Sequence, residues 1–165
     1  MAFVFASVHF KLDKLLEGIK SILGNVPLVG SSGAGIITPE GIDTNAVAVM
    51  LVSSTKVKLI AVCEKDLDKK DLNLCGQTLA NAAFKKLGPL PREAFIVLID
   101  GLLKNSSNLI SGIKQILGTS LPIVGGLSAD DLTFTKTYQF FNYEILSNSA
   151  VGILIGQDAV IKIGI

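Results

Sequence analysis

The sequence predicts a mixed α/β domain that is rich in strands and whose two halves are copies of one unit. Apolar segments of strand length alternate with segments that place apolar residues at helical spacing. The chain has 165 residues, the size of one domain, and 49% of them are hydrophobic. This composition is typical of strands buried on both faces, so we expect mixed parallel and antiparallel sheets covered by helices.

The first half begins with a strand, a helix and a second strand. The strands are predicted at 3–6 and 27–30, where short runs are apolar. The helix is predicted because apolar residues recur at helical spacing from Leu12 to Leu23, and Gly24 ends it. The short connections between these elements predict a right-handed parallel βαβ unit.

Extended segments follow before the chain reaches a second helix. Residues 35–42 are expected to be extended. The segments 45–52 and 56–62 are expected to pair as a hairpin through residues 53–55. A helix is predicted at 71–87, because its apolar residues fall on one face.

From residue 95 the order of elements begins again. We expect a strand at 95–100, a helix at 109–117, a strand at 121–126, a hairpin at 137–146, and two closing strands at 149–156 and 159–165. The hairpin is expected to turn at Asn142, since asparagine is common in tight turns.

Three pairs of segments repeat one another along the chain. They are 18–24 with 112–118, which agree at six of seven positions, 27–30 with 122–125, and 45–52 with 148–155. We therefore predict two copies of a β-α-β-β-β-β unit, related by an internal pseudo-twofold axis. Within one domain of residues 1–165, the expected parts are copy one at 1–64, a linking helical segment at 65–90 and copy two at 91–165.

Four loops are candidates for ligand binding, because ligands bind beyond the carboxyl ends of parallel strands. The candidate ligand-binding residues in these loops are Ser7, Gly30, Ser31, Ser32, Gly35, Asp100, Gly101, Gly125, Gly126, Ser128 and Asp130. The glycines permit close approach by a ligand or positive φ. Asp100 and Asp130 each fit two roles, a turn residue that bonds its own backbone and an acceptor for a ligand amine or hydroxyl.

The glycine-rich stretch at 30–35 has two further interpretations. It lacks the lysine and the following helix of a phosphate-binding loop, so nucleotide binding is disfavoured. A hydrolase or transferase would use Ser31 or Ser32 with His9, the only histidine, but the helix that follows a nucleophile turn is missing too. We expect no catalytic residue, no metal site and no cofactor.

Charge and hydropathy exclude several classes of function. The net charge of +1 gives no electrostatic basis for binding nucleic acid. No apolar run reaches the ~18 residues of a membrane helix, and the N-terminus lacks the basic segment of a signal peptide. Cys63 and Cys75 are too far apart for a metal or redox motif, so we expect buried thiols in the reducing cytoplasm.

Several segments, taken in order, resemble a known family. In the second half they are FIVLIDGLL at 95–103, LPIVGGLSAD at 121–130, FTKTYQFFN at 134–142 and SAVGILIG at 149–156. In the first half they are VFAS at 4–7, the stretch 15–37 and NAVAVMLV at 45–52. Together they resemble the N-terminal FIST domain, named for F-box and intracellular signal transduction proteins. Ser31 stands where the family has cysteine or serine.

The resemblance implies a non-catalytic sensory domain of signal transduction that binds small ligands, such as amino acids or related metabolites. The residues it carries over are Asp100, Gly101, Gly125, Gly126 and Asp130, with Gly30, Ser31, Ser32 and Gly35 in the first half. A C-terminal FIST domain or a signalling protein is the implied partner. An unpaired apolar final strand predicts a homodimer. A protein-interaction scaffold is the remaining alternative.

Overall fold

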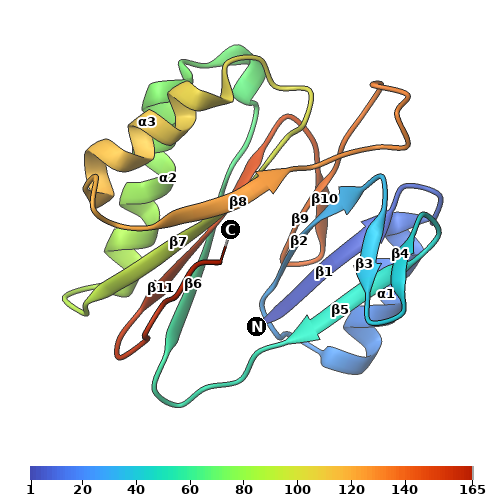
Figure 1. The fold of residues 1–165 in the computed structure, drawn as a ribbon, viewed down its shortest axis with the longest axis horizontal. Coiled ribbons are helices and arrows are strands. Elements are labelled where there is room, and N and C mark those ends of the chain that lie inside the picture. The colour runs from blue at the N-terminus through green and yellow to red at the C-terminus, as the bar shows by residue number, and fades with distance from the viewer. Residues whose placement is uncertain (165) are drawn as a thin grey trace.

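The computed structural model describes residues 1–164 and has four layers, with helices outside and two β-sheets facing each other inside (Figure 1). The strands are β1 (Ala2–Ser7), β2 (Leu28–Gly33), β3 (Ile36–Thr38), β4 (Gly41–Asp43), β5 (Val47–Leu51), β6 (Lys58–Glu64), β7 (Arg92–Ile99), β8 (Ile123–Leu127), β9 (Gln139–Phe141), β10 (Glu144–Leu146) and β11 (Ala150–Gly156). The helices are α1 (Leu12–Leu23), α2 (Leu72–Leu87) and α3 (Ser106–Leu117), with a short 3-10 turn, η1, at Leu67–Lys69.

The strands form two main sheets and a separate hairpin. Sheet 1 has the order β10-β9-β2-β1-β5, sheet 2 has the order β6-β11-β7-β8, and β3 and β4 form a separate two-stranded sheet. Strands β1 and β2 are parallel, as are β7 and β8, and the other pairs are antiparallel. The predicted mixed α/β class with mixed sheets is therefore confirmed.

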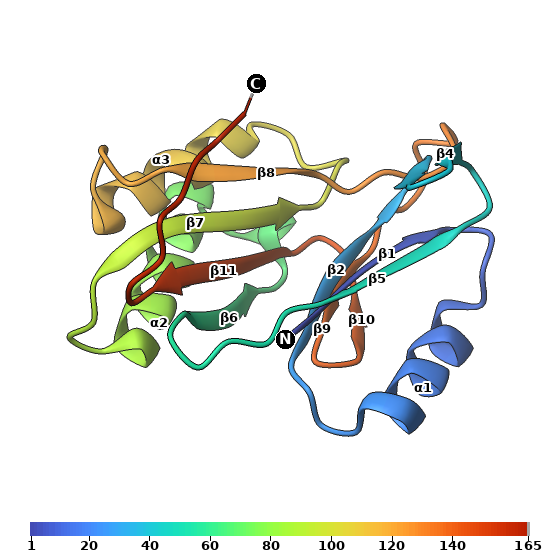
Figure 2. The same ribbon diagram turned by 60° about the horizontal axis from the view of Figure 1, so that its bottom comes forward.

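Side chains along a strand point alternately to the two faces of its sheet, so neighbouring residues belong to different parts of the hydrophobic core. Ala2 and Val4 of β1 face α1, whereas Phe3 faces sheet 2 and packs with Val151 and Ile153 of β11. On the other side, α2 and α3 cover sheet 2 with a larger apolar cluster. Figure 2 shows α1 alone on sheet 1 and the two other helices together on sheet 2. No helix within residues 1–164 is long and apolar enough to cross a membrane.

Two glycines allow α2 and α3 to pack at unusually close range. A Cβ atom on Gly76 would lie 2.1 Å from the carbonyl oxygen of Leu109, and one on Gly112 would lie 2.0 Å from that of Asn73. Since real contacts of this kind are not shorter than 3.0 Å, any side chain at either position would push the helices apart.

The three predicted helices and most of the predicted strands are confirmed, but two pairings are wrong. The segments 45–52 and 56–62 do not form a hairpin, because β5 pairs with β1 and β6 pairs with β11. The link between them crosses from one sheet to the other, and the Ser54 hydroxyl accepts the N–H groups of Lys56 and Val57 within it.

The predicted closing strand at 159–165 is also absent from its described part, residues 159–164. Strand β11 already has β6 on one side and β7 on the other, so it offers no edge for a hairpin partner. The chain leaves β11 through Gln157 and Asp158, which both have positive φ. The unpaired final strand that predicted a homodimer is therefore missing, and Ile165 lies outside the described residues.

The two halves share topology and register. In each, a parallel βαβ unit is followed by a later strand that pairs antiparallel with the first strand. Val4 lies opposite Gly30 of β2 and Val49 of β5. Val97 occupies the matching position, opposite Gly125 of β8 and Gly152 of β11. This correspondence agrees with an internal duplication, and the duplication and its boundaries remain predictions.

Candidate functional site

The predicted site residues lie where parallel strands end, but β2 continues further than the sequence predicted. It runs to Gly33, so Ser31 and Ser32 belong to a strand and only Gly35 lies beyond it. The side chains of Ser31 and Ser32 point to opposite faces of sheet 1, since neighbouring residues of a strand alternate. The interpretation of 30–35 as a loop is therefore wrong for most of its length.

Ser32 joins β2 to the segment between β8 and β9. Its hydroxyl donates a 2.7 Å hydrogen bond to the carbonyl of Ala129 and accepts one of 3.0 Å from the N–H of Tyr138. The Ser32 backbone bonds the same two residues: its N–H donates to the carbonyl of Tyr138, and its carbonyl accepts the N–H of Ala129. These four bonds fix the crossover that brings β9 to β2, and they leave the hydroxyl fully engaged.

Asp100 caps the end of β7 and is almost fully buried. One carboxylate oxygen accepts the N–H of Leu102 at 2.9 Å, and the other accepts the N–H of Asn148 at 2.8 Å. Both oxygens thus bind the backbone of the protein itself, which corresponds to the turn role of the two predicted for this aspartate.

Asp130 organises the loop that follows β8. Its oxygens accept hydrogen bonds from the N–H groups of Thr135 and Phe134 and from the hydroxyl of Thr133. These bonds, that of Thr135 first, favour the ionised form and lower the pKa of Asp130 from 3.8 to about 2. Phe134 has positive φ, so the loop closes tightly around this carboxylate.

A buried polar chain links the ends of three strands and was missed by the sequence analysis. The amide of Gln139 donates to the hydroxyl of Ser128 at 2.9 Å and accepts from the hydroxyl of Ser149 at 2.6 Å. Thr137, next to it, accepts the N–H of Gly101 at 3.1 Å. The available signal was Gln139, an amide within the apolar strand sequence TYQFF.

Three of the predicted glycines lie very close to backbone atoms of other residues in the protein. A Cβ atom would lie 1.8 Å from the Val4 carbonyl at Gly30, 1.8 Å from the Val97 carbonyl at Gly125, and 1.9 Å from the Ser128 carbonyl at Gly101. The close approach therefore comes from neighbouring strands and loops. Gly126 differs, because a Cβ atom there would meet no atom within 4 Å.

The serine and histidine of the hydrolase alternative are not joined. The Nε2 atom of His9 lies 4.0 Å from an oxygen of Asp131, and the histidine side chain is about half exposed. Its backbone N–H donates to the hydroxyl of Ser7 at 3.3 Å. Within residues 1–164, no hydrogen bond connects His9 to Ser31 or Ser32.

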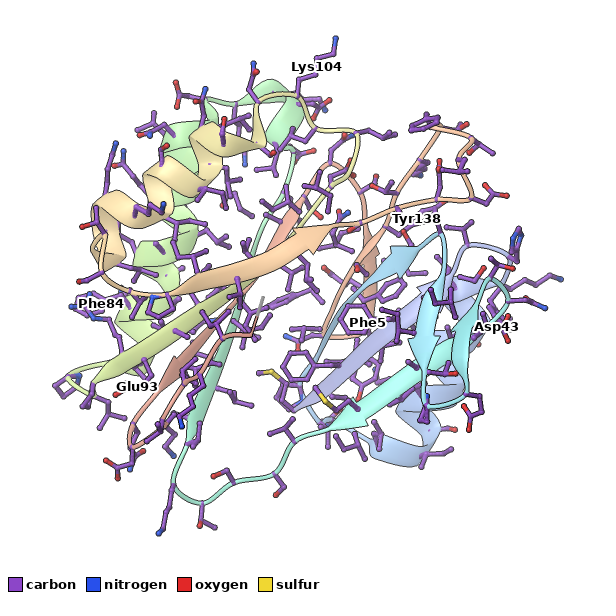
Figure 3. All side chains as sticks on the ribbon, viewed as in Figure 1. Phe5, Asp43, Phe84, Glu93, Lys104 and Tyr138 are labelled. Carbon is purple, nitrogen blue, oxygen red and sulfur yellow. The ribbon has the colours of Figure 1, made fainter. Side chains whose placement is uncertain are left out.

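One cavity gathers five of the predicted residues. This rim cavity has a volume of about 530 Å³ and lies between β3, the edge of sheet 1 and the free edge of sheet 2. It is lined by Phe5, Ser31, Ser32, Gly33, Gly35, Ile36, Ile37, Ala48, Ile96, Leu98, Gly125, Gly126 and Leu127. Figure 3 labels Phe5, which lies on β1 near the separate hairpin.

The lining of the rim cavity is neutral and mostly apolar. None of the described residues that line it is charged. Ser31 lies opposite Phe5, which faces sheet 2, so its side chain is the polar one on this face, whereas that of Ser32 points to the other face of sheet 1. The Ser31 hydroxyl makes no hydrogen bond in the part of the chain that the structure describes, so it is free to bind a ligand. Sequence reasoning did not find the apolar wall, which includes Ile36, Ile96 and Leu98, because such residues also form an ordinary core.

The other predicted residues lie away from the rim cavity. Six of the predicted residues do not line it: Ser7, Gly30, Asp100, Gly101, Ser128 and Asp130.

Burial raises the pKa of both cysteine thiols, Cys63 and Cys75. Among residues 1–164, no three histidine, cysteine or acidic side chains come together in a way that could hold a metal ion.

These features define a mixed α/β domain with helices outside, two facing sheets and a neutral cavity at their rim. Comparison with family models identifies it: the model of the FIST N domain matches residues 1–165, the whole chain. The chain therefore belongs to the FIST N domain family, whose members are generally sensory domains of signal transduction. No curated protein gives a significant match.

Proposed function

We propose that this FIST N domain senses a small molecule bound in the rim cavity and performs no catalysis on it. The observation that carries the proposal is the cavity itself, whose volume of about 530 Å³ falls in the range of small-ligand sites. It also lies at the carboxyl end of β2 and beside β8, the region where parallel strands place ligands.

The chemistry of the lining favours an uncharged, largely apolar ligand. Apolar surface buried against Ile36, Ile96 and Leu98 would supply most of the affinity, at about 25 cal/mol per Å². The free hydroxyl of Ser31 would give direction by one hydrogen bond. A charged group finds no partner in the lining, and the carboxylates of Asp100 and Asp130 already accept backbone N–H groups.

An amino acid, the ligand class first predicted, fits this cavity only in one orientation. An apolar side chain would enter among the isoleucines and leucines, and the ammonium and carboxylate groups would remain in solvent at the opening. Derivatives that lack these charges fit without that restriction.

Within the same proposal, the domain acts in the cytoplasm as a homodimer and passes its signal to a C-terminal FIST domain or another signalling protein.

The test is a thermal-shift panel of neutral apolar metabolites and amino acids on the wild-type chain and two glycine variants. Gly126→Leu should fill the cavity, because its side chain would project into open space. Gly18→Leu is the matched control, since Gly18 also has no neighbour within 4 Å but lies on α1, away from the cavity. Both variants should fold.

A true ligand present at 100 times its Kd should stabilise the wild-type chain by about 2.7 kcal/mol, or roughly 5–10 °C in Tm. The shift should persist in Gly18→Leu and disappear in Gly126→Leu. A shift that survives Gly126→Leu would place the ligand elsewhere. Turnover of the ligand, lost on Ser31→Ala, would show an enzyme instead of a sensor.

A further inference from the structure

Strand β8 has a free edge where its counterpart in the other sheet is covered. Within residues 1–164, β8 ends sheet 2 and no strand pairs with its outer side, as Figure 2 shows. Its counterpart β2 is paired on the outer side with β9, in antiparallel register. Residues 27–30 and 122–125 are also alike in sequence, so the two edges are built from similar segments.

The free peptide groups of β8 can be assigned from its bonds to β7. Phe95 N–H donates to the carbonyl of Pro122, and Ser128 N–H donates to the carbonyl of Ile99. The peptide groups of the even-numbered residues from 122 to 128 thus face β7. Because peptide groups alternate along a strand, those of Ile123, Gly125 and Leu127 point outward and are open to a further strand.

The pairing of β9 with β2 shows what such an edge accepts. Phe140 lies opposite Gly30 and is fully buried, with its ring against the space above that glycine. Three residues later, at the hairpin turn, the Tyr143 hydroxyl donates to the carbonyl of Val26 at 2.9 Å. The ammonium of Lys20 lies 5.5 Å from the Tyr143 ring centre, a cation–π contact.

In sheet 2 the matching space is an open cavity. This α3-side cavity has a volume of about 510 Å³ and lies beside Gly125, between β8 and α3. Lys114, in its lining, corresponds to Lys20 in the aligned segments, and Ile110 and Leu121 correspond to Leu16 and Val26 next to them. Val97 matches Val4 in strand register. The first sheet fills that position with Phe140 and Tyr143.

We propose that the free edge of β8 binds an extended segment of a partner protein, in antiparallel register, through an aromatic residue placed opposite Gly125. The ring would enter the α3-side cavity, as Phe140 packs above Gly30. A second aromatic residue three positions later would lie against Lys114, the only charged residue that lines this cavity. The outward peptide groups supply affinity, and the cavity supplies selectivity.

Charge and shape together favour this occupant over a plain apolar strand. Lys114 forms no ion pair within residues 1–164, so its ammonium is available to an aromatic face. Gly125 has φ of 154° and no side chain, so a large ring can approach the β8 backbone there. Leu127, which is 55% exposed, extends the apolar surface beside the edge.

The probe is a fluorescent peptide with the sequence of residues 136–147, KTYQFFNYEILS, which carries the Phe140 and Tyr143 pair. Fluorescence anisotropy should show saturable binding to the full chain. The matched control is the same peptide with alanine in place of Phe140 and Tyr143, and it should bind at least ~10-fold more weakly.

Two protein variants locate the binding. Leu127→Pro removes an outward N–H that β7 does not use, and proline is tolerated at such edge positions. It should weaken peptide binding at least ~10-fold. Lys114→Ala, an exposed change that leaves the fold intact, should weaken it about threefold. Lys104→Ala is the control, because Lys104, labelled in Figure 3, lines neither cavity and should bind as wild type.

The proposal is overturned if the peptide does not bind, or if it binds Lys114→Ala and Leu127→Pro as tightly as wild type. The latter result would mean that the peptide displaces β9 from β2. Sedimentation of the unmodified chain supplies a separate criterion. A dimer that dissociates on Leu127→Pro would show that a second copy of the chain occupies the β8 edge, and would also overturn the proposal.

Discussion

Alanine in place of Gly112 should destabilise the domain, although alanine is the better helix former. The glycine lies in the segment GIKQILG of α3, and Gly18 lies in the nearly identical GIKSILG of α1. Gly18→Ala is therefore a matched control with the same local sequence. In a helix interior the exchange of glycine for alanine stabilises by about 1 kcal/mol, and Gly18 has open space around it.

The packing of α2 against α3 reverses this sign at Gly112. A Cβ atom there would lie 2.0 Å from the Asn73 carbonyl oxygen, about 1.4 Å short of the 3.4 Å at which ordinary contact begins. The obstacle is helix backbone, so the helices must separate and loosen the core around Leu109 and Ile113. Overpacking costs about 1–3 kcal/mol, and the upper end applies here. We expect a net loss of about 2 kcal/mol.

Urea unfolding followed by circular dichroism measures both variants against the wild-type chain. The expected difference between Gly18→Ala and Gly112→Ala is about 3 kcal/mol, or roughly 6–12 °C in Tm for a chain of this size. Gly76→Ala should behave like Gly112→Ala, because it meets the Leu109 carbonyl at 2.1 Å. If Gly18→Ala and Gly112→Ala both stabilise, the close approach of the two helices is refuted.

Three further predictions concern the polar residues at the strand ends. Ser32→Ala should lower the unfolding free energy by about 1–3 kcal/mol in urea titrations, since Ala129 and Tyr138 lose a buried partner, while Ser31→Ala stays within about 0.5 kcal/mol. Gln139→Leu should cost about 2–4 kcal/mol by the same assay, because two buried serine hydroxyls lose their partner, and an unchanged midpoint would contradict the polar chain. The pKa of Asp130 is lowered in the folded chain, so its stabilising effect is complete above about pH 4 and disappears as the pH falls towards about 2. Asp130→Asn should flatten the acid limb of stability against pH in that window, and a limb equal to wild type would exclude this carboxylate as its source.

The helices and most strands could be predicted because each has its own local pattern. Leu12 to Leu23 repeat at helical spacing and form α1 with the predicted bounds. Sheet membership could not be predicted in the same way. Strand β5 follows the glycine-rich stretch closely in sequence, but its pairing with β1 depends on which edges are open after the whole chain has folded.

The candidate site was predicted in part, for a related reason. Serines and glycines near strand ends were visible in the sequence, and five of them line the rim cavity. Their aspartate neighbours were equally visible, but nothing local distinguished a ligand acceptor from a carboxylate that binds its own backbone. Asp100 illustrates this, since one of its donors is Asn148, which is 48 residues away. Only the folded chain identifies such a donor.

The buried polar groups also explain why the cavity lies at the rim. Asp100 bonds the end of β7 to the segment before β11, and Ser32 bonds the end of β2 to the segment before β9. Gln139 bonds the start of β9 to Ser128, at the end of β8. The polar groups at these positions are therefore engaged by the protein itself. Unpaired, these groups would each cost about 1–3 kcal/mol in a buried position, and paired they fix the crossover between the sheets. The open space then remains beside β8, where no strand within residues 1–164 covers Gly125 and Gly126. Of the polar residues that first indicated a ligand site, Asp100 and Ser32 therefore hold the strands around the cavity in place, although Asp100 does not line it.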